Sequence, residues 1–146
     1  MECSTKSYEE TNVHGMSQLD LVIKVYDGAI TAYQDAAHSY KKSDSQKGYD
    51  FLERAKRFVV HLYTTLDEEK GAEIATGLGK LYSFVIAETD VVSATKDIKK
   101  IDDLVAILDN LRQGWLGLKE QEGSSSLATS LATAGEGSTG GFTTSA

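Results

Sequence analysis

Hydrophobic residues recur at a helical period throughout the central part of the chain. They are spaced by threes and fours in four successive stretches, residues 22–40, 52–66, 74–85 and 101–115. That spacing places apolar side chains on one face of an α-helix, and no stretch shows the alternation of a strand. The chain also contains no Pro, the residue that interrupts helices. Four helices of roughly 20–25 residues with short connections predict an all-α fold, an antiparallel up-down-up-down four-helix bundle.

Polar residues mark where three of these helices begin. Ser17 with Asp20 is typical of a capping box, in which each side chain binds the backbone N–H of the other residue. Ser43 with Gln46 predicts a second capping box. Asp97 is the candidate N-cap of the last helix.

Composition divides the chain into three zones. Residues 1–16 are polar and predict a flexible N-terminal segment, whereas residues 17–122 carry almost all the large apolar side chains and predict the bundle domain. Residues 123–146 consist almost wholly of Gly, Ser, Thr and Ala. Their few large apolar side chains cannot offset the entropy of ordering the segment, so we expect a disordered tail.

Charge and cysteine content exclude several classes of function. The 146 residues include 15 basic and 22 acidic side chains, a net charge of −7, with no block of Lys or Arg. Binding to nucleic acid or to an anionic membrane surface needs clustered positive charge, so we expect neither partner. The longest unbroken aliphatic run, Leu104 to Leu108, is far too short to span a bilayer, so we also expect no membrane insertion. The first residues lack the apolar core of a secretion signal, and a single Cys excludes an internal disulfide. Together these features favour the cytoplasm.

Three of the predicted helices carry more hydrophobic surface than one core requires. A core-facing helix needs an apolar arc of about 100°, whereas the last three helices carry arcs of about 180–200°. Single exposed apolar residues are ordinary, but an excess on three helices favours grooves that receive an amphipathic partner segment. Each candidate contact in these arcs could equally belong to the core. The candidates are Phe51, Phe58, Leu78, Tyr82, Val85, Ile107 and Leu111.

No residue pattern supports catalysis or a metal site. A di-metal bundle needs paired Glu-x-x-His motifs, and only Asp35 with His38 has a comparable spacing. A phosphotransfer bundle needs an exposed His, whereas His61 lies between Val60 and Leu62 and is expected to be half-buried. We therefore expect no enzyme, no metal and no cofactor.

Several strings resemble the signatures of the flagellar secretion chaperone FliS family. The first contains Tyr26, Asp27 and Gly28, and the last contains Arg112 and Trp115. The match covers about residues 8–120, with the strings in the family's order. The matching strings are residues 21–30, 66–75, 81–82 and 111–115, together with the lead-in from Tyr8 to Val13.

The chain departs from the family pattern at a few places. Gln18 stands where the family often has Pro, which removes some preorganisation at the start of the helix. Gly71 is followed by Ala72 where two consecutive Gly are usual. The Gly-, Ser- and Thr-rich tail is also unlike the usual short ending.

The resemblance implies a cytoplasmic, non-enzymatic chaperone that binds the disordered C-terminal segment of flagellin. It would prevent premature polymerisation and deliver flagellin to a component of the flagellar export gate. The bound segment would lie as short helices along the hydrophobic surface, with Tyr8 and Val13 covering or helping to form the groove. The structural residues that we expect are Tyr26, Asp27, Gly28, Gly71, Arg112 and Trp115.

Two further expectations concern pairing and assembly. Arg112 falls on an apolar face, so its guanidinium should reach solvent or pair with a carboxylate such as Asp27 or Glu73.

The surplus apolar surface has an alternative explanation, a self-associating structural bundle whose second copy covers it. The sequence leaves the oligomeric state open between a monomer and a weak dimer.

Overall fold

The described part of the chain is helical. The computed structural model describes residues 17–66 and 72–135, with side chains described up to residue 121. No strand occurs within these ranges, which confirms the predicted all-α class. The helices are α2 (Gln18–Lys41), α3 (Ser45–Thr64), α4 (Ala72–Thr95) and α5 (Ile98–Gly135).

The chain divides into two units, residues 1–112 and 113–146, and α5 contributes to both. α5 continues to Gly135, beyond residue 122, where we placed the end of the bundle domain. That stretch contains no Pro to end a helix. The disorder predicted for residues 123–146 stays a prediction, and residues 1–16 lie outside the described residues.

The first helix begins as the sequence predicts. The Asp20 backbone N–H donates to the Ser17 hydroxyl over 3.1 Å, and the Ser17 N–H donates to the Asp20 carboxylate over 3.4 Å. Asp97 accepts from the Lys99 N–H over 3.0 Å at the start of α5, as expected for an N-cap. Both caps satisfy backbone donors that have no partner within the helix.

The prediction for the start of α3 was wrong by one residue. Asp44, not Ser43, is the N-cap, and it accepts from the Lys47 N–H over 3.1 Å. Ser43 has a φ of 62°, which is the left-handed conformation that commonly ends a helix. The side chain of Gln46 donates to Asp50 instead.

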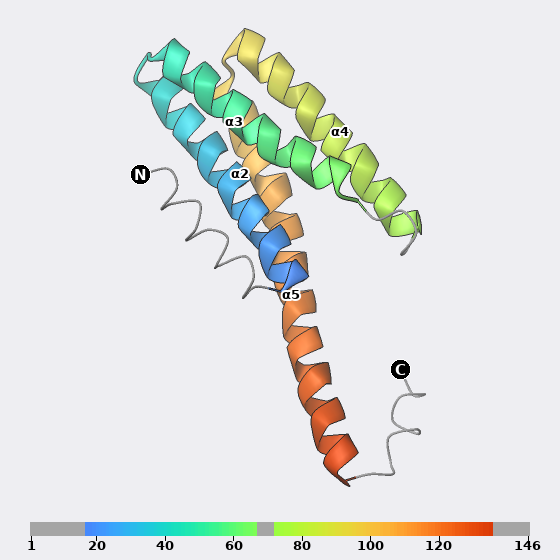
Figure 1. The fold of residues 1–146 in the computed structure, drawn as a ribbon. Helices are drawn as coiled ribbons and strands as arrows, with labels where there is room; N and C mark the ends of the chain where they lie inside the picture. The colour runs from blue at the N-terminus through green and yellow to red at the C-terminus, as the bar shows by residue number, and fades with distance from the viewer. Residues whose placement is uncertain (1–16, 67–71, 136–146) are drawn as a thin grey trace, which may run out of the picture. The chain divides into compact units, whose positions relative to one another are not determined.

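Contacts between helices establish their directions. Gly28 of α2 lies against Phe58 of α3, and Gly48 of α3 lies against Tyr40 of α2. Later residues of one helix therefore meet earlier residues of the other, so these two helices are antiparallel. Two hydrogen bonds join α2 to α4 one heptad apart in the same direction, so those helices are parallel. The start of α5 lies beside the upper half of α4, where Lys100 is 3.5 Å from Glu88. The order is therefore up-down-up-down, as the colour sequence in Figure 1 shows.

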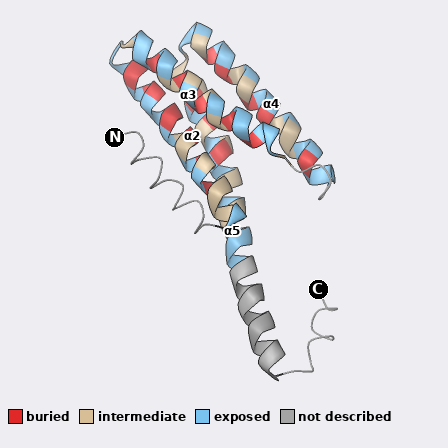
Figure 2. Cartoon of the chain, in the orientation of Figure 1, coloured by how far each residue is buried: buried red, intermediate tan, exposed pale blue. Residues whose placement is uncertain are grey.

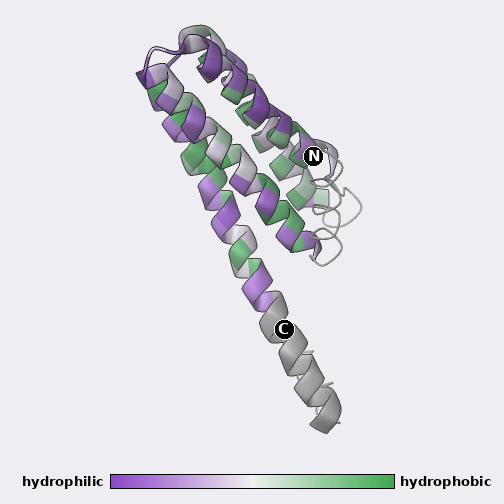
Figure 3. Cartoon of the chain, turned by 60° about the vertical axis from the view of Figure 1, so that its left-hand side comes forward, coloured by the Kyte–Doolittle hydropathy of each residue, from purple (hydrophilic) through white to green (hydrophobic). Residues whose placement is uncertain are grey.

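The core lies between the helices and is rich in tyrosine. Tyr26 and Tyr33 are completely buried, and Tyr40 is 8% exposed, as their heptad spacing predicts. α2 and α3 pack closely where Gly28 faces the Phe58 ring and Gly48 faces the Tyr40 ring. Figure 2 shows the buried residues on the facing sides of the helices, and Figure 3 shows hydrophobic and hydrophilic residues interleaved along them.

Candidate partner-binding surface

The structure separates the seven candidate contacts of the described helices into three groups. Tyr82 and Val85 are 1% and 0% exposed, so they belong to the core and not to the outer surface. Phe51 and Phe58 are half-buried on the side of α3 that faces α2. The remaining candidates, Leu78, Ile107 and Leu111, are half-buried on α4 and α5. Tyr8 and Val13 lie outside the described residues.

Apolar side chains follow one continuous stripe on each of α4 and α5. On α4 the stripe runs at spacings of three and four from Ile74 to Val91, and Glu88 interrupts it near its upper end. On α5 Lys100, Ile107 and Leu111 share one face. Because Glu88 pairs with Lys100, the two stripes lie along the same edge of the bundle. We call these apolar residues the α4–α5 strip: Ile74, Leu78, Leu81, Phe84, Val91, Ile107 and Leu111.

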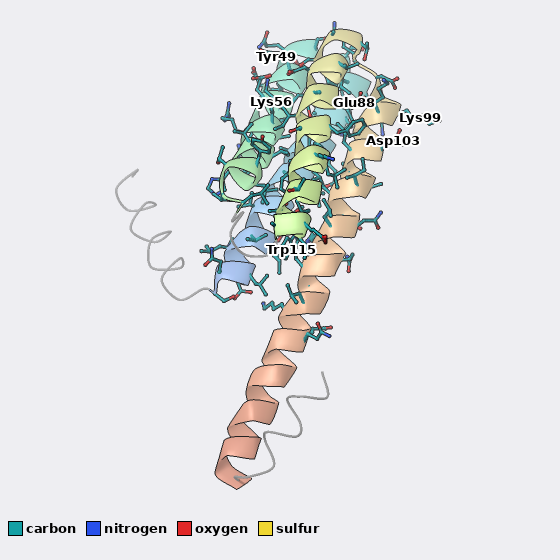
Figure 4. The ribbon with its side chains drawn as sticks, turned by 90° about the vertical axis from the view of Figure 1, so that its right-hand side faces the viewer. Tyr49, Lys56, Glu88, Lys99, Asp103 and Trp115 are labelled. Carbon is teal, nitrogen blue, oxygen red and sulfur yellow. The ribbon has the colours of Figure 1, made fainter. Side chains whose placement is uncertain are left out.

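The strip is open to solvent along α4. The side chains of Ile74, Phe84 and Val91 are 67%, 50% and 39% exposed. Because α4 and α5 are antiparallel and Glu88 lies opposite Lys100, Leu81 is level with Ile107. Figure 4 shows α4, with Glu88, between α3 and α5. The ion pair therefore interrupts the strip near the α4–α5 turn, with Val91 on the side of the turn and the larger part of the apolar surface continuing toward Ile74.

Sequence reasoning missed the most exposed members of the strip. Ile74 and Phe84 were within the predicted apolar arc of their helix, but a helical period alone did not separate them from core positions. Neighbouring Val85 is completely buried, although Phe84 beside it is half exposed. Exposure along such a wide arc depends on where the neighbouring helices lie, which the sequence of one helix does not specify.

A second set of exposed apolar residues lies on α3. Tyr49, Val60 and Tyr63 are 46%, 39% and 45% exposed. Lys56 lies among them and reaches the carboxylates of Asp90 on α4, over 2.9 Å, and of Glu53, over 3.2 Å. These charged groups interrupt the apolar character of the α3–α4 edge, and burial of Lys56 by a partner would require desolvating them.

Two hydrogen bonds across the core hold α4 in register with α2. The hydroxyls of Tyr26 and Tyr82 are bonded, and the hydroxyl of Tyr33 lies 2.5 Å from Oγ1 of Thr89. Thr89 itself donates to the Val85 carbonyl over 2.6 Å, so Tyr33 is the donor to Thr89. Burial raises the pKa of Tyr33 to about 12 and also raises the pKa of Tyr82. These bonds fix the orientation of α4, and with it the direction in which Phe84 points.

Specific contacts hold four of the predicted structural residues, Tyr26, Asp27, Gly28 and Arg112. Arg112 pairs with Asp27, with Nε and Oδ1 separated by 2.5 Å, which confirms one of the two expected partners. A Cβ at Gly28 would lie 2.7 Å from Cζ of Phe58, so Gly28 makes room for that ring. Trp115 lies on α5 in the second unit. Gly71 is outside the described residues.

The two histidines of the described residues, His38 and His61, belong to no metal-binding cluster. His61 is exposed, contrary to the half-buried position that its apolar neighbours suggested, because it points away from the face that carries Leu62. His38 is also exposed. Within residues 17–66 and 72–121, no three His, Cys, Asp or Glu side chains gather in a way that could hold a metal ion. None of the described helices is long and apolar enough to cross a membrane.

The fold and the strip define a helical-bundle protein with an open apolar surface. A sequence model of one family, described as "Flagellar protein FliS", matches residues 1–122. The chain belongs to this FliS family.

Individual relatives agree with the family match. The chain is 29% identical over 107 residues to the flagellar secretion chaperone FliS of Salmonella typhimurium, covering 73% of this chain and 79% of that protein. It is 24% identical over 109 residues to the flagellar secretion chaperone FliSB of Pseudomonas aeruginosa, covering 75% and 82%. A crystal structure titled as a flagellar chaperone from bacteria matches with a TM-score of 0.69 at 20% identity, covering 82% of this chain and 98% of that one. This last likeness concerns the fold alone.

Proposed function

We propose that this protein is a cytoplasmic flagellar export chaperone that binds the disordered C-terminal segment of flagellin along the α4–α5 strip. By holding that segment it prevents premature polymerisation, and it delivers flagellin to the export apparatus. The protein acts by binding and carries out no chemical reaction. The names of its relatives support the chaperone role, and the exposed strip is the observation that supports the binding site.

The strip suits an amphipathic helix better than an extended peptide. Its members recur at helical spacing on two antiparallel helices, so they form an apolar surface that runs parallel to the helix axes. A helix laid along such a surface places side chains at i, i+3, i+4 and i+7 against it. An extended strand needs an exposed sheet edge for its backbone hydrogen bonds, and the described helices offer none.

Chaperoning then follows from mass action between two sets of apolar contacts. The flagellin segment buries its apolar face on the chaperone instead of on another flagellin molecule. Each bound segment is removed from the population that can polymerise. Since no covalent bond is made, a competing partner can release the segment by binding either molecule more tightly.

A calorimetric titration tests this function directly. The full chain is titrated with a peptide of the cognate flagellin C-terminus, at several temperatures. We expect binding with a negative heat-capacity change, together with a gain of helix by circular dichroism, because an apolar surface is covered and a disordered segment is ordered. The absence of binding heat and of any helix gain at tens of micromolar would contradict the proposal.

Self-association is the competing explanation of the strip. If a second copy covers it, sedimentation of the isolated chain will give a dimer that flagellin peptide does not dissociate. A flagellin chaperone predicts instead that the peptide and any weak self-association compete for the same surface. Sedimentation with and without peptide therefore distinguishes the two.

A further inference from the structure

A second groove lies between α2 and α3, on the opposite edge of the bundle from the α4–α5 strip. Val25 of α2 and Phe58 of α3 provide its apolar floor, and Arg54, Arg57 and His61 of α3 border it. Its volume is about 450 Å³. We call it the α2–α3 groove. The half-buried Phe58 ring is held at its base because Gly28 has no side chain to displace it.

The charge at this groove is opposite to that of the whole chain. The protein carries a net charge of −7, yet α3 has four Lys and Arg residues against two Asp and Glu residues. Arg54, Arg57 and His61 lie at helical spacing along the outer face of α3, so one row of basic groups follows the groove. A positive row on an acidic protein attracts acidic partners selectively and speeds their association.

The two arginines are available for a partner. Within residues 17–66 and 72–121, neither Arg54 nor Arg57 forms an ion pair, whereas the neighbouring Lys56 pairs with both Glu53 and Asp90. Arg54 and Arg57 are both exposed to solvent. A guanidinium presents a fork of donors that matches a carboxylate, and it keeps its charge at any relevant pH.

We infer that the α2–α3 groove binds an acidic amphipathic helix from a second protein. An aliphatic or aromatic side chain of that helix covers Phe58 and Val25, and carboxylates beside it pair with Arg54 and Arg57. The two arginines are three residues apart, so carboxylates at i and i+3 of a helix that lies along α3 can pair with both. The apolar floor provides affinity and the arginines select an acidic segment.

This site does not depend on the strip proposed for flagellin. The α2–α3 and α4–α5 edges involve different helices, so both can be occupied at once. The protein would then hold its cargo on one edge and be recognised by an acidic partner on the other. Because none of the groove residues belongs to the strip, failure of one proposal leaves the other standing.

The test uses the full chain and a synthetic amphipathic peptide of Leu, Ala and Glu. The peptide has about 15 residues, which is long enough to form a helix. A second peptide carries Lys in place of every Glu. Binding is measured by fluorescence anisotropy at low and high salt. The variant R54E/R57E reverses the groove charge, and the control K80E/K99E makes the same charge change at exposed positions on α4 and α5. Circular dichroism checks that both variants fold.

We expect the Glu peptide to bind the unaltered chain and the K80E/K99E control alike. Its affinity should fall at least about tenfold in R54E/R57E and in high salt, because charge pairs provide the selectivity. The Lys peptide should bind R54E/R57E better than the unaltered chain. Flagellin-peptide binding should be the same in all three proteins.

Four results would overturn the inference. One is equal affinity of the two peptides, and another is equal affinity of the Glu peptide for the unaltered chain and R54E/R57E. The third is binding that appears only after residues 1–16 are removed, which would assign the groove to the chain's own N-terminus. A dimer that R54E/R57E dissociates would likewise replace the proposed partner with a second copy.

Discussion

Tyr33 donates its hydroxyl proton to Oγ1 of Thr89 across the core, with 2.5 Å between the two oxygens. Tyr26 and Tyr82 are joined in the same way one heptad below. The long tyrosine side chains of α2 reach across the core to α4. These bonds therefore set the position of α4, the helix that provides most of the α4–α5 strip.

Thr89→Val should destabilise the fold by about 1–3 kcal/mol, because it leaves the buried Tyr33 hydroxyl without an acceptor. Tyr33→Phe combined with Thr89→Val should cost less than Thr89→Val alone, since no polar group is then unpaired. Urea unfolding of the two single variants and the double variant measures this as a cycle. Strictly additive losses would show that the bond has no role in stability.

Stability should decline in alkaline solution. The pKa of Tyr33 is raised to about 12 in the folded state, whereas an unfolded tyrosine ionises near 10. The contribution of this group is complete below pH ~10 and is lost as pH rises from ~10 through ~12, because the unfolded chain releases its proton first. Urea unfolding at pH 8 and pH 11 should show the decline. In the Tyr33→Phe, Thr89→Val double variant the decline should be smaller.

Gly28→Ala should destabilise the protein by about 1–3 kcal/mol, since its Cβ would approach the Phe58 ring to 2.7 Å. Phe58→Leu in the same chain should recover part of this loss by shortening the opposing side chain. Gly77→Ala is the matched control: a Cβ there meets nothing within 4 Å, so the change should stabilise α4 by up to ~1 kcal/mol. Thermal unfolding of the variants distinguishes a steric effect from a general response to alanine.

The Asp27–Arg112 ion pair should contribute only modestly to stability. The two side chains are 50% and 28% exposed, and pairs of this kind contribute about 0.2–1 kcal/mol. Asp27→Asn should therefore lower the free energy of unfolding by less than ~1 kcal/mol, with a smaller loss in high salt. A loss of several kcal/mol that salt does not reduce would instead indicate a buried, dehydrated pair.

Much of the fold could be predicted from the sequence because helical periodicity is a local property. The spacing of Tyr26 and Tyr33 correctly placed both in the core, and the Ser17 capping box marked the first helix correctly. The cap of α3 was misplaced because Ser43 adopts a left-handed conformation that no neighbouring residue signals. Backbone strain of this kind depends on how the turn joins two packed helices.

The candidate site was predictable only in outline. The width of each apolar arc predicted a surplus of apolar surface. It did not predict which edge of the arc remains exposed to solvent. Tyr82 and Val85 are buried, whereas Phe84, which lies between them in the sequence, is half exposed. The side of α4 that carries Phe84 faces solvent and not a neighbouring helix. Resolving that difference required the positions of the other helices.

The most direct test of the account compares two charge insertions on exposed apolar residues. Phe84→Asp places a carboxylate on the α4–α5 strip, and Val60→Asp does so on α3, at side chains that are 50% and 39% exposed. The measurement is the dissociation constant of a cognate flagellin C-terminal peptide for each folded variant. The account predicts at least about a tenfold weakening for Phe84→Asp and unchanged affinity for Val60→Asp. Equal affinities for the two variants, or a loss confined to Val60→Asp, would contradict it.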